Sequence, residues 1–427
     1  MHLQHDELKP KFQVKYARSK LIGQTQFRNR LLSSSQIFHR KSSDVAGNSK
    51  APVDSSSPVW SWNEWDPLEE IIVGTPEGAV VPRLLPEVKM CTPMDKWDFY
   101  EKNAGRYWAD CIPKEHWEKV VKEVEEYVRV LQMEGVKVLR PSKVNHLSTF
   151  KLLGFESQGF YAAMPRDFLL VIGNELIEAT MTWRSRYFEY LAYRPLLLEY
   201  WKQGAKWTVA PKPTDFDAII NKEVVKKLDS GVSDKSNIGF ITTESEPCFD
   251  AADFTRAGRD IFCQRSQVTN LAGIEWVRRH VEPLGIRVHQ LTFTDPRPMH
   301  IDATFVFAKP GIAIQNPDRP CDQTELIKAA GWDVINAPTP NVPKTHPYWL
   351  GSPWLSMNVL MLDPERVLVE KGETAIHEMY RRIGITPIPV ALRHANSIGG
   401  SFHCWTSDIR RRGKLESYFD WSKAGCP

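Results

Sequence analysis

Short apolar runs recur in pairs along the chain, and turn-forming residues such as Gly173 and Asn174 separate the two members of a pair. Runs of this kind, rich in β-branched and aromatic residues and bounded by turns, predict β-hairpins. The clearest pairs are residues 167–172 with 176–177, 299–307 with 312–314, and 355–362 with 367–369. Weaker copies begin near Asp250, near Phe402 and at Pro67.

Helical patterns lie between these hairpins. In residues 114–133 the apolar side chains recur every three or four positions, and the pattern ends at Gly135. This spacing predicts an amphipathic helix, and glycine commonly follows the last turn of a helix. Shorter helices are predicted for residues 270–280, 324–330 and 374–383.

The order of hairpin, helix and strand repeats about five times along the chain, with a period of roughly 50 to 90 residues. Mixed units that repeat in this way favour a closed radial array of α/β modules over a doubly wound sheet. The alternative is an unrelated α/β fold in which the hairpins only look alike.

The N-terminal segment differs from the rest of the chain. Residues 26–43 are basic and rich in serine and contain no acid, a composition typical of a mitochondrial transit segment. Asp6 and Glu7 do not fit this pattern, and the alternative is a plain disordered tail. We therefore expect residues 1–58 to be a disordered targeting segment and residues 59–427 to form a single domain. Without import, the protein would be cytoplasmic.

Composition places the chain among ordinary globular proteins, with 42% hydrophobic and 25% charged residues over 427 positions. A net charge of +3 gives no reason to expect nucleic acid or an anionic membrane as the main partner. No apolar run is long enough to span a bilayer. We expect a soluble protein whose membrane contact is at most peripheral, at the inner membrane.

The seven cysteines form no CxxC pair and no zinc-finger spacing, which favours free thiols in a reducing compartment. The chain also lacks the glycine spacing of a dinucleotide-binding fingerprint, a GxxxxGK[ST] motif and an HExxH motif. We therefore expect an enzyme that uses neither a metal ion nor an organic cofactor.

Polar residues stand at matching places in the repeated units. Asp167, Asp250, His300, Asp302 and Cys404 all lie at or near the first strand of a predicted hairpin. Equivalent positions of a radial array face a common centre, so the pattern predicts one cavity with carboxylates, an imidazole and a thiol. His300 and Asp302 are two positions apart in a predicted strand and would project from the same face. Their burial would be costly unless each had a polar partner.

Cys404 follows two glycines, in the sequence Gly-Gly-Ser-Phe-His-Cys-Trp-Thr at 399–406. The glycines allow the backbone to approach a ligand closely or to begin a strand after an irregular turn. In an extended segment His403 would point away from Cys404, so the activating imidazole is expected to be His300. The alternative for Cys404 is that of the other cysteines, a small buried apolar side chain.

Long segments of the globular part carry a resemblance to a known family. They are residues 63–70, 163–167, 246–253, 264–270, 298–304, 316–320 and 402–406. Through these segments the chain resembles the arginine:glycine amidinotransferase family. The resemblance implies a pentein-like fold, a five-bladed pseudo-symmetric α/β propeller of ββαβ modules around a central channel. It also implies a homodimer.

The resemblance implies a transferase that moves the amidino group of L-arginine to glycine by a ping-pong mechanism. The products would be ornithine and guanidinoacetate, the creatine precursor. Asp167 and Asp302 would hold the guanidinium, and Arg319 would hold the substrate carboxylate. The implied roles are nucleophile for Cys404, general acid and base for His300, orientation of this histidine for Asp250, and substrate binding for Asp167, Asp302, Arg319, Ser352 and Met299.

Two positions depart from the family pattern. Gly351 replaces one member of a substrate-contacting serine pair, and Arg297 replaces a small polar residue shortly before His300. The added cation would either favour an acceptor with an acid or phosphate, such as an inosamine phosphate, or face solvent. A guanidine hydrolase on the same fold and a non-catalytic propeller that serves as a binding module stay as alternatives.

Overall fold

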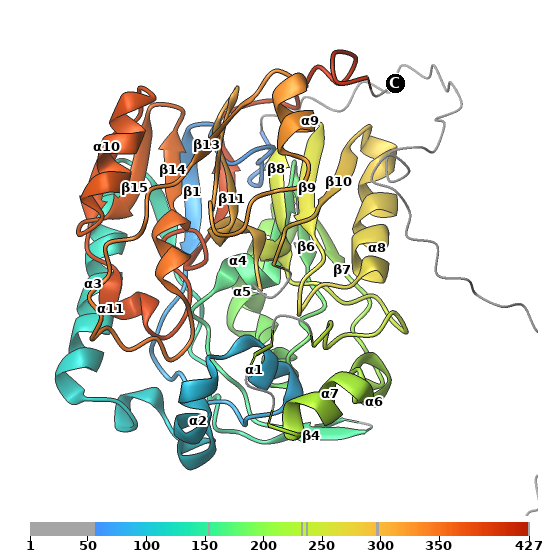
Figure 1. Ribbon diagram of the computed structural model, residues 1–427, viewed down its shortest axis with the longest axis vertical. Helices are drawn as coiled ribbons and strands as arrows, with labels where there is room; N and C mark the ends of the chain where they lie inside the picture. The colour runs from blue at the N-terminus through green and yellow to red at the C-terminus, as the bar shows by residue number, and fades with distance from the viewer. Residues whose placement is uncertain (1–55, 153, 232–233, 236–237, 296–298, 426–427) are drawn as a thin grey trace, which may run out of the picture. The chain divides into compact units, whose positions relative to one another are not determined.

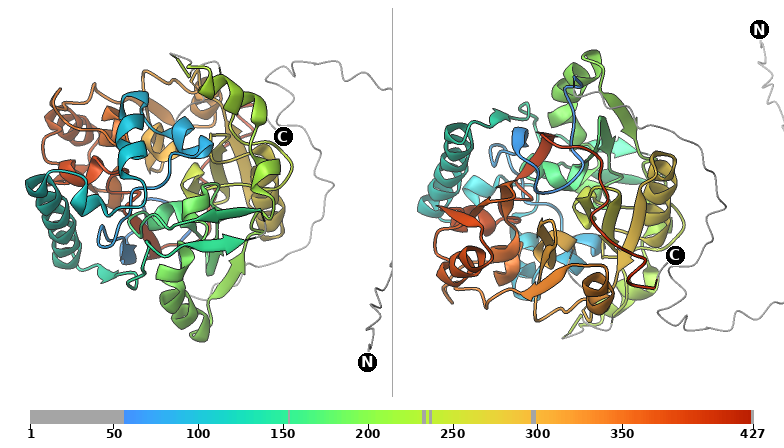
Figure 2. Two further views of the ribbon diagram at one scale, coloured as in Figure 1. Left: turned by 90° about the horizontal axis from the view of Figure 1, so that it is seen from below. Right: turned by 90° about the horizontal axis from the view of Figure 1, so that it is seen from above.

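Five three-stranded sheets in the computed structural model follow one plan (Figure 1). The structure describes residues 56–425, with the exception of residues 153, 232–233, 236–237 and 296–298. In each of the sheets the middle strand pairs antiparallel with one neighbour and parallel with the other. Figure 2 shows the sheets arranged about a common centre.

Four sheets are each built from one continuous stretch of chain. They consist of β5 (Leu169–Ile172), β6 (Glu175–Glu178) and β7 (Lys206–Val209); β8 (Phe254–Ala257), β9 (Asp260–Gln264) and β10 (Arg287–Leu291); β11 (Phe305–Lys309), β12 (Ile312–Gln315) and β13 (Asp333–Asn336); and β14 (Leu360–Asp363), β15 (Arg366–Glu370) and β16 (Thr386–Val390).

The fifth sheet joins the two ends of the folded chain. Its strands are β17 (Thr406–Arg411), β1 (Leu68–Val73) and β2 (Lys137–Leu139). β17 pairs antiparallel with β1, with Thr406 opposite Val73. The separate hairpins predicted near Phe402 and at Pro67 are therefore wrong, because these segments supply the two antiparallel strands of one sheet. Pairing between residues this far apart in sequence has no local signal.

A helix connects the second and third strands of each sheet, which gives the module the order ββαβ. These helices are α3 (Lys114–Met133), α5 (Tyr190–Lys202), α8 (Leu271–Val281), α9 (Thr324–Ala329) and α10 (Thr374–Arg382). Four of them were predicted, and α5 was missed. Pro195 lies inside α5, and proline argues against a helix interior.

Helix α3 shows how the periodicity builds a module. Val120 and Leu131 are fully buried, and they share a core cluster with Ile71 and Val73 of β1. Burial of one such aliphatic side chain contributes about 1.5–3 kcal/mol. The amphipathic face of α3 therefore holds the helix against the sheet that closes the chain.

Further short elements lie at one end of the sheets, at the bottom of Figure 1. They are α1 (Pro86–Cys91), α2 (Trp97–Asn103), α6 (Phe216–Ile219), α7 (Lys222–Asp229) and the hairpin of β3 (Phe150–Leu152) and β4 (Phe155–Ser157). None of the described helices is both long enough and apolar enough to cross a membrane.

In three of the sheets that are built from one continuous stretch of chain, a helical turn precedes the first strand. Predicted site residues lie in these turns or next to them. These turns are α4 (Pro165–Phe168) before β5, the 3₁₀ turn η5 (Ala251–Asp253) before β8, and η7 (Ile301–Ala303) before β11. The prediction that His300 and Asp302 alternate in a strand is wrong. Asp302 lies inside η7, and His300 is the residue at its N-terminal end.

Candidate active site

The turns at the starts of the first strands bring the predicted site residues together. Asp167 lies in α4, Asp250 immediately before η5, His300 and Asp302 at η7, and Cys404 in the turn before β17. One polar atom each of Asp167, His300 and Cys404 lie within 4.8 Å of one another. All five side chains are buried. The repeated position that the sequence indicated is therefore a single cluster in space.

His300 lies between two carboxylates. Its Nε2 is 3.2 Å from Oδ2 of Asp250, and its Nδ1 is 3.5 Å from Oδ1 of Asp167. Burial opposes a charged ring, but the charge of Asp167 and hydrogen bonds such as that to Asp250 outweigh it. The pKa of His300 is raised well above its ordinary value, so the ring is a cation at neutral pH.

Cys404 is held as a neutral thiol. Burial and the negative charge of Asp302 raise the pKa of the thiol to about 12, although a hydrogen bond with His300 opposes the shift. The Sγ–H group donates to Oδ2 of Asp302 over 3.4 Å. A thiol is a weak nucleophile until it loses its proton, so this site needs a change in local charge before Cys404 can react.

Asn358 organises the turn that carries Cys404. Its Oδ1 accepts backbone N–H groups from Ser401, His403 and Cys404, each over 3.1 Å. Its Nδ2 donates to Cys404 Sγ over 3.2 Å. The carbonyl side of this one buried amide therefore fixes the turn, and the amino side faces the sulfur.

Gly400 explains why glycine precedes this turn. Its φ is +65°, and a Cβ at this position would come within 2.6 Å of both Cys404 Cβ and Met164 Sδ. A side chain would therefore be strained by the backbone and would push against the sulfur-bearing residue. The close contacts of Gly400 are with Cys404 and Met164, and the predicted close approach of this backbone to a ligand stays a prediction.

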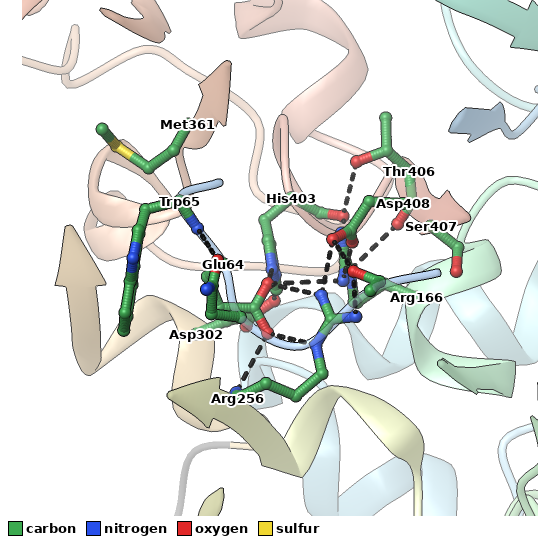
Figure 3. A network of polar contacts seen from close by, with 12 residues as sticks. Glu64, Trp65, Arg166, Arg256, Asp302, Met361, His403, Thr406, Ser407 and Asp408 are labelled. Atoms are coloured by element: carbon green, nitrogen blue, oxygen red, sulfur yellow. Dashed lines mark hydrogen bonds and ion pairs between the residues drawn. The ribbon is translucent and has the colours of Figure 1, made fainter. Parts of the chain in front are cut away.

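His403 links Asp302, near Cys404, to Glu64. His403 Nδ1 is 2.7 Å from Asp302 Oδ2, and His403 Nε2 is 3.2 Å from Oε2 of Glu64 (Figure 3). The sequence prediction placed His403 in an extended segment, in which it would point away from Cys404. The segment instead coils into a turn, with Trp405 N–H bonded to the Ser401 carbonyl. This turn directs His403 toward Asp302.

Arg186 supports the opposite carboxylate. Its Nη1 donates to Oδ2 of Asp167 over 2.8 Å, and Glu189 accepts from its Nε and Nη2 over 2.6 and 2.8 Å. Burial outweighs the charges of His300 and Arg186, so the pKa of Asp167 is raised above its ordinary value. The Arg186–Glu189 pair thus fixes the orientation of Asp167 toward His300.

The other predicted substrate-binding residues lie in adjacent parts of the fold. Arg319 is buried and donates to Thr304 Oγ1, directly after η7, and to the Asp295 carbonyl. Met299 is half-buried and packs against the cluster that contains Cys404. Ser352 is exposed at the start of η8 (Pro353–Met357). Arg297 lies outside the described residues.

Several residues of the site were missed by sequence reasoning. Glu64 and His403 stand in the segments that carry the resemblance, which was a usable signal. Arg186 and Asn358 stand outside those segments, and only the fold brings them to Asp167 and Cys404. The six cysteines in the described part of the chain are free, as predicted.

Comparisons with known proteins agree with this geometry. A search of family models found no match. The chain is 56% identical to the mitochondrial glycine amidinotransferase of Xenopus laevis over 85% of both chains. It is 46% identical to the L-arginine:L-lysine amidinotransferase of Pseudomonas savastanoi pv. phaseolicola, over 85% of this chain and 97% of the relative.

Solved structures show the same fold. An amidinotransferase of the saxitoxin pathway from Microseira wollei has a TM-score of 0.75 at 44% identity, over 85% of this chain and all of that one. The inosamine-phosphate amidinotransferase of Streptomyces griseus has a TM-score of 0.73 at 32% identity, over 85% of this chain and 99% of that one. The N-terminal domain of a cyanobacterial arginine dihydrolase, at 13% identity and a TM-score of 0.52, shares the fold alone, over 81% of this chain and 98% of that domain.

A ring of ββαβ modules with these neighbours defines a transferase on the pentein-like α/β propeller, and the predicted fold class is confirmed. Within this class the chain belongs to the glycine amidinotransferase family, as the animal relatives at 53–56% identity establish. Those relatives are named as mitochondrial, in agreement with the mitochondrial location predicted from the sequence.

Proposed function

We propose that this chain moves the amidino group of L-arginine to glycine through a covalent intermediate on Cys404. The products are ornithine and guanidinoacetate, a precursor of creatine. The observation that carries the proposal is the approach of Asp167, His300 and Cys404 to within 4.8 Å in a member of the amidinotransferase family. Asp167 and Asp302 are proposed to grip the guanidinium through charge-assisted hydrogen bonds, which place its carbon beside the sulfur.

Arginine binding supplies the change in charge that Cys404 needs. In the free protein the thiol proton is held by Asp302, and the carboxylates keep the thiol neutral. The guanidinium replaces this proton as the cation beside Asp302, and the proton leaves to solvent. One positive charge is exchanged for another, so the reactive thiolate forms without a net increase of negative charge in the buried cluster.

The first half-reaction breaks the bond between the guanidinium carbon and Nε of arginine. The thiolate attacks the carbon, and the His300 cation donates its proton to the departing Nε, which becomes the side-chain amine of ornithine. Cys404 then carries a cationic amidino-thioether, and His300 is neutral. Asp167 and Asp302 pair with the new cation.

The second half-reaction reverses the roles. Glycine attacks the amidino carbon through its neutral amine, the carbon–sulfur bond breaks, and neutral His300 takes the proton that the amine loses. Guanidinoacetate leaves as a guanidinium, and the thiolate and the His300 cation are restored. Asp250 orients the ring in both halves. Arg319, Ser352 and Met299 are proposed to contact the remainder of the substrates.

The decisive experiment is product analysis with arginine and glycine. Ornithine and guanidinoacetate are expected, and Cys404→Ala should produce neither. Citrulline as the main product would instead establish a guanidine hydrolase, and the absence of turnover would favour a binding module. Ornithine formation by Cys404→Ala at the rate of the parent protein would refute the nucleophile.

The acceptor is proposed from the animal relatives, whose names specify glycine. Other relatives are named for lysine and for an inosamine phosphate, so the acceptor varies in this family. A screen of glycine, lysine and amino-sugar phosphates, with and without Arg297→Asn, measures the preference. A higher kcat/KM for a phosphorylated acceptor than for glycine would contradict the assignment.

A homodimer is also proposed, and it is supported by an apolar stripe. Leu191, Leu198 and Trp201 lie on one face of α5, and Val209 lies on the adjacent edge strand β7; their exposed fractions are 44%, 38%, 55% and 48%. Contiguous exposed apolar side chains mark association sites. Light scattering should give twice the chain mass for the parent and a lower mass for Trp201→Glu. A monomeric parent would contradict the dimer.

Residues 1–58 are proposed to be a mitochondrial transit segment, and residues 59–427 are proposed to form a single domain. Almost all of this segment lies outside the described residues. A chain without residues 1–50 should keep its activity and lose import into mitochondria. Import of the shortened chain at the parent's level would contradict the assignment. Peripheral association with the inner membrane stays a prediction.

A further inference from the structure

The ring of His403 is held between two carboxylates that belong to distant parts of the chain. Nδ1 lies 2.7 Å from Oδ2 of Asp302, and Nε2 lies 3.2 Å from Oε2 of Glu64. A carboxylate oxygen can only accept, and a neutral imidazole has only one N–H group. Both contacts are hydrogen bonds only when both ring nitrogens carry protons. The geometry therefore requires an imidazolium at His403.

The carboxylate behind this ring is itself fixed. Arg256 donates from Nε and Nη2 to the two oxygens of Glu64, over 2.8 and 2.9 Å. The same guanidinium donates to Oδ2 of Asp408 over 2.6 Å, and Arg166 pairs with the other oxygen of Asp408. All of these groups are buried (Figure 3). Glu64 thus presents a fixed negative charge to Nε2 of His403.

Asp302 is the group in front of the ring, and it faces the reacting sulfur. Its Oδ2 accepts from both His403 and Cys404. Burial alone would favour the neutral acid, which cannot pair with a guanidinium. The hydrogen bond and the charge of His403 outweigh burial, and the pKa of Asp302 is lowered. One side chain therefore holds the orientation and the charge of the carboxylate that receives the substrate.

We propose that His403, anchored by Glu64, is a positioning residue for amidino transfer that keeps Asp302 oriented and ionised for the guanidinium of arginine. This inference rests on the proposed function, because it assigns arginine to Asp302. It adds a second histidine to the site, with a role distinct from that of His300. His300 moves protons, and His403 holds one.

The proton on His403 gives the proposal a pH signature. The groups that face the ring are Asp302 from η7, Glu64 from the segment before β1, and Arg166 from α4. Burial and the charge of Arg166 lower the pKa of His403, but the hydrogen bonds to the two carboxylates raise it above its ordinary value. The charged ring contributes to arginine binding at pH values below this raised pKa, and the contribution is lost as the pH rises through it.

The test measures arginine binding without chemistry, in full-length Cys404→Ala protein. Isothermal titration calorimetry gives the dissociation constant at about pH 7 and about pH 9, both of which lie above the pKa of about 6.5 of an ordinary histidine. The second substitution is His403→Gln, whose amide can still donate one hydrogen bond to Asp302 but carries no charge. Loss of one charge-assisted hydrogen bond corresponds to about 10- to 100-fold weaker binding at neutral pH. The dissociation constants of the Cys404→Ala protein with and without His403→Gln should therefore differ less at about pH 9 than at about pH 7.

The matched control is His289→Gln in the same background. His289 is equally buried, and its Nε2 lies 2.7 Å from Oδ1 of Asp260, another buried carboxylate. This pair is remote from Cys404 in the fold, on β10 and β9, so arginine affinity should change by less than about twofold. A similar loss for both variants would indicate a general structural effect and would overturn the proposal.

The outcomes separate this inference from the proposed function. If Cys404→Ala protein binds no arginine, the proposed function is wrong. If it binds arginine and His403→Gln binds it equally well at both pH values, the inference on His403 is wrong and the proposed function stands. Should His403→Gln fail to fold, Glu64→Gln keeps the ring and removes its anchor. In the Cys404→Ala background, Glu64→Gln is then expected to lose arginine affinity at a lower pH than the protein without this substitution. An unchanged dependence of arginine affinity on pH would overturn the proposal.

Discussion

At the scale of single residues, the chemistry of the site depends on groups that complete the contacts of the reacting atoms. Asn358 is the clearest example, because its amide serves two purposes at once. Its oxygen accepts three backbone N–H groups of the turn, and its nitrogen donates to Cys404 Sγ. A donor aimed at sulfur stabilises the thiolate more than the thiol. Asn358 should therefore affect reactivity beyond its structural role.

Replacement of Asn358 by aspartate separates these two purposes. Asn358→Asp keeps acceptor atoms for the backbone and replaces the donor to Cys404 with a negative oxygen. Removal of one hydrogen bond to a charged group should lower kcat about 10- to 100-fold and raise the pKa of the thiol. The pH dependence of alkylation at Cys404, followed by mass spectrometry of its peptide, measures this pKa directly.

The control for this prediction is Asn270→Asp. Asn270 is as deeply buried, and its Oδ1 accepts the N–H groups of Cys248 and Gly273 while its Nδ2 donates to two carbonyls. This variant should lose stability and leave Cys404 alkylation unchanged. The assignment of Asn358 fails if both variants alter alkylation alike, or if Asn358→Asp leaves it as in the parent.

At the scale of elements, a short turn before a first strand is the repeated device of this fold. The sequence predicted the hairpins from their apolar runs, and it placed the site residues near the first strands. It could not predict that residues 301–303 form a 3₁₀ turn, because an alternating polar pattern is compatible with both a strand and a tight turn. The orientation of His403 was missed for the same reason. Local pattern thus located the chemistry but did not determine the direction of each side chain.

The turn before β17 requires glycine at position 400, and this requirement can be tested. In Gly400→Ala the positive φ should cost about 1–2 kcal/mol in the free energy of unfolding. The new methyl group would also press on Cys404 and Met164, so ornithine release should fall by an order of magnitude or more. Gly135→Ala, at φ +83° after α3 with no atom within 4 Å of the new Cβ, should cost similar stability and leave activity intact. Equal activity of the two variants would contradict the role of Gly400.

At the scale of the whole molecule, buried ion pairs connect the modules where the chain closes on itself. Asp408 of β17 pairs with Arg256 of β8, with Arg166 of α4 and with Arg411 of its own strand. Glu64 joins the same network from the segment before β1. No sequence pattern predicts it, since Glu64 and Arg256 are 192 positions apart. Family resemblance supplied the proposed catalytic residues, and the fold supplied the groups that hold them.

This network should dominate the acid stability of the protein. Burial raises the pKa of Asp408, but the surrounding arginines outweigh it and hold the pKa well below the ordinary aspartate value of 3.8. A carboxylate with a lowered folded-state pKa stabilises the fold above its unfolded value, and this contribution is lost as the pH falls through the folded value. The contribution of Asp408 to stability should therefore be complete from neutral pH down to about 4 and be lost only in stronger acid.

Replacement of Asp408 by asparagine tests this stabilisation directly. Asp408→Asn leaves three buried guanidinium groups with one fewer negative partner, and disruption of a buried ion pair costs about 3–5 kcal/mol. Urea unfolding at neutral pH measures the loss. The control is Asp363→Asn, whose pair with Arg366 reaches the surface and should contribute at most about 1 kcal/mol. If the two variants lose equal stability, or if Asp408→Asn unfolds as the parent does, the closure of the ring does not depend on this network. If the predicted difference is found, the same charges that anchor His403 also hold the segment before β1 and the strand β17 together.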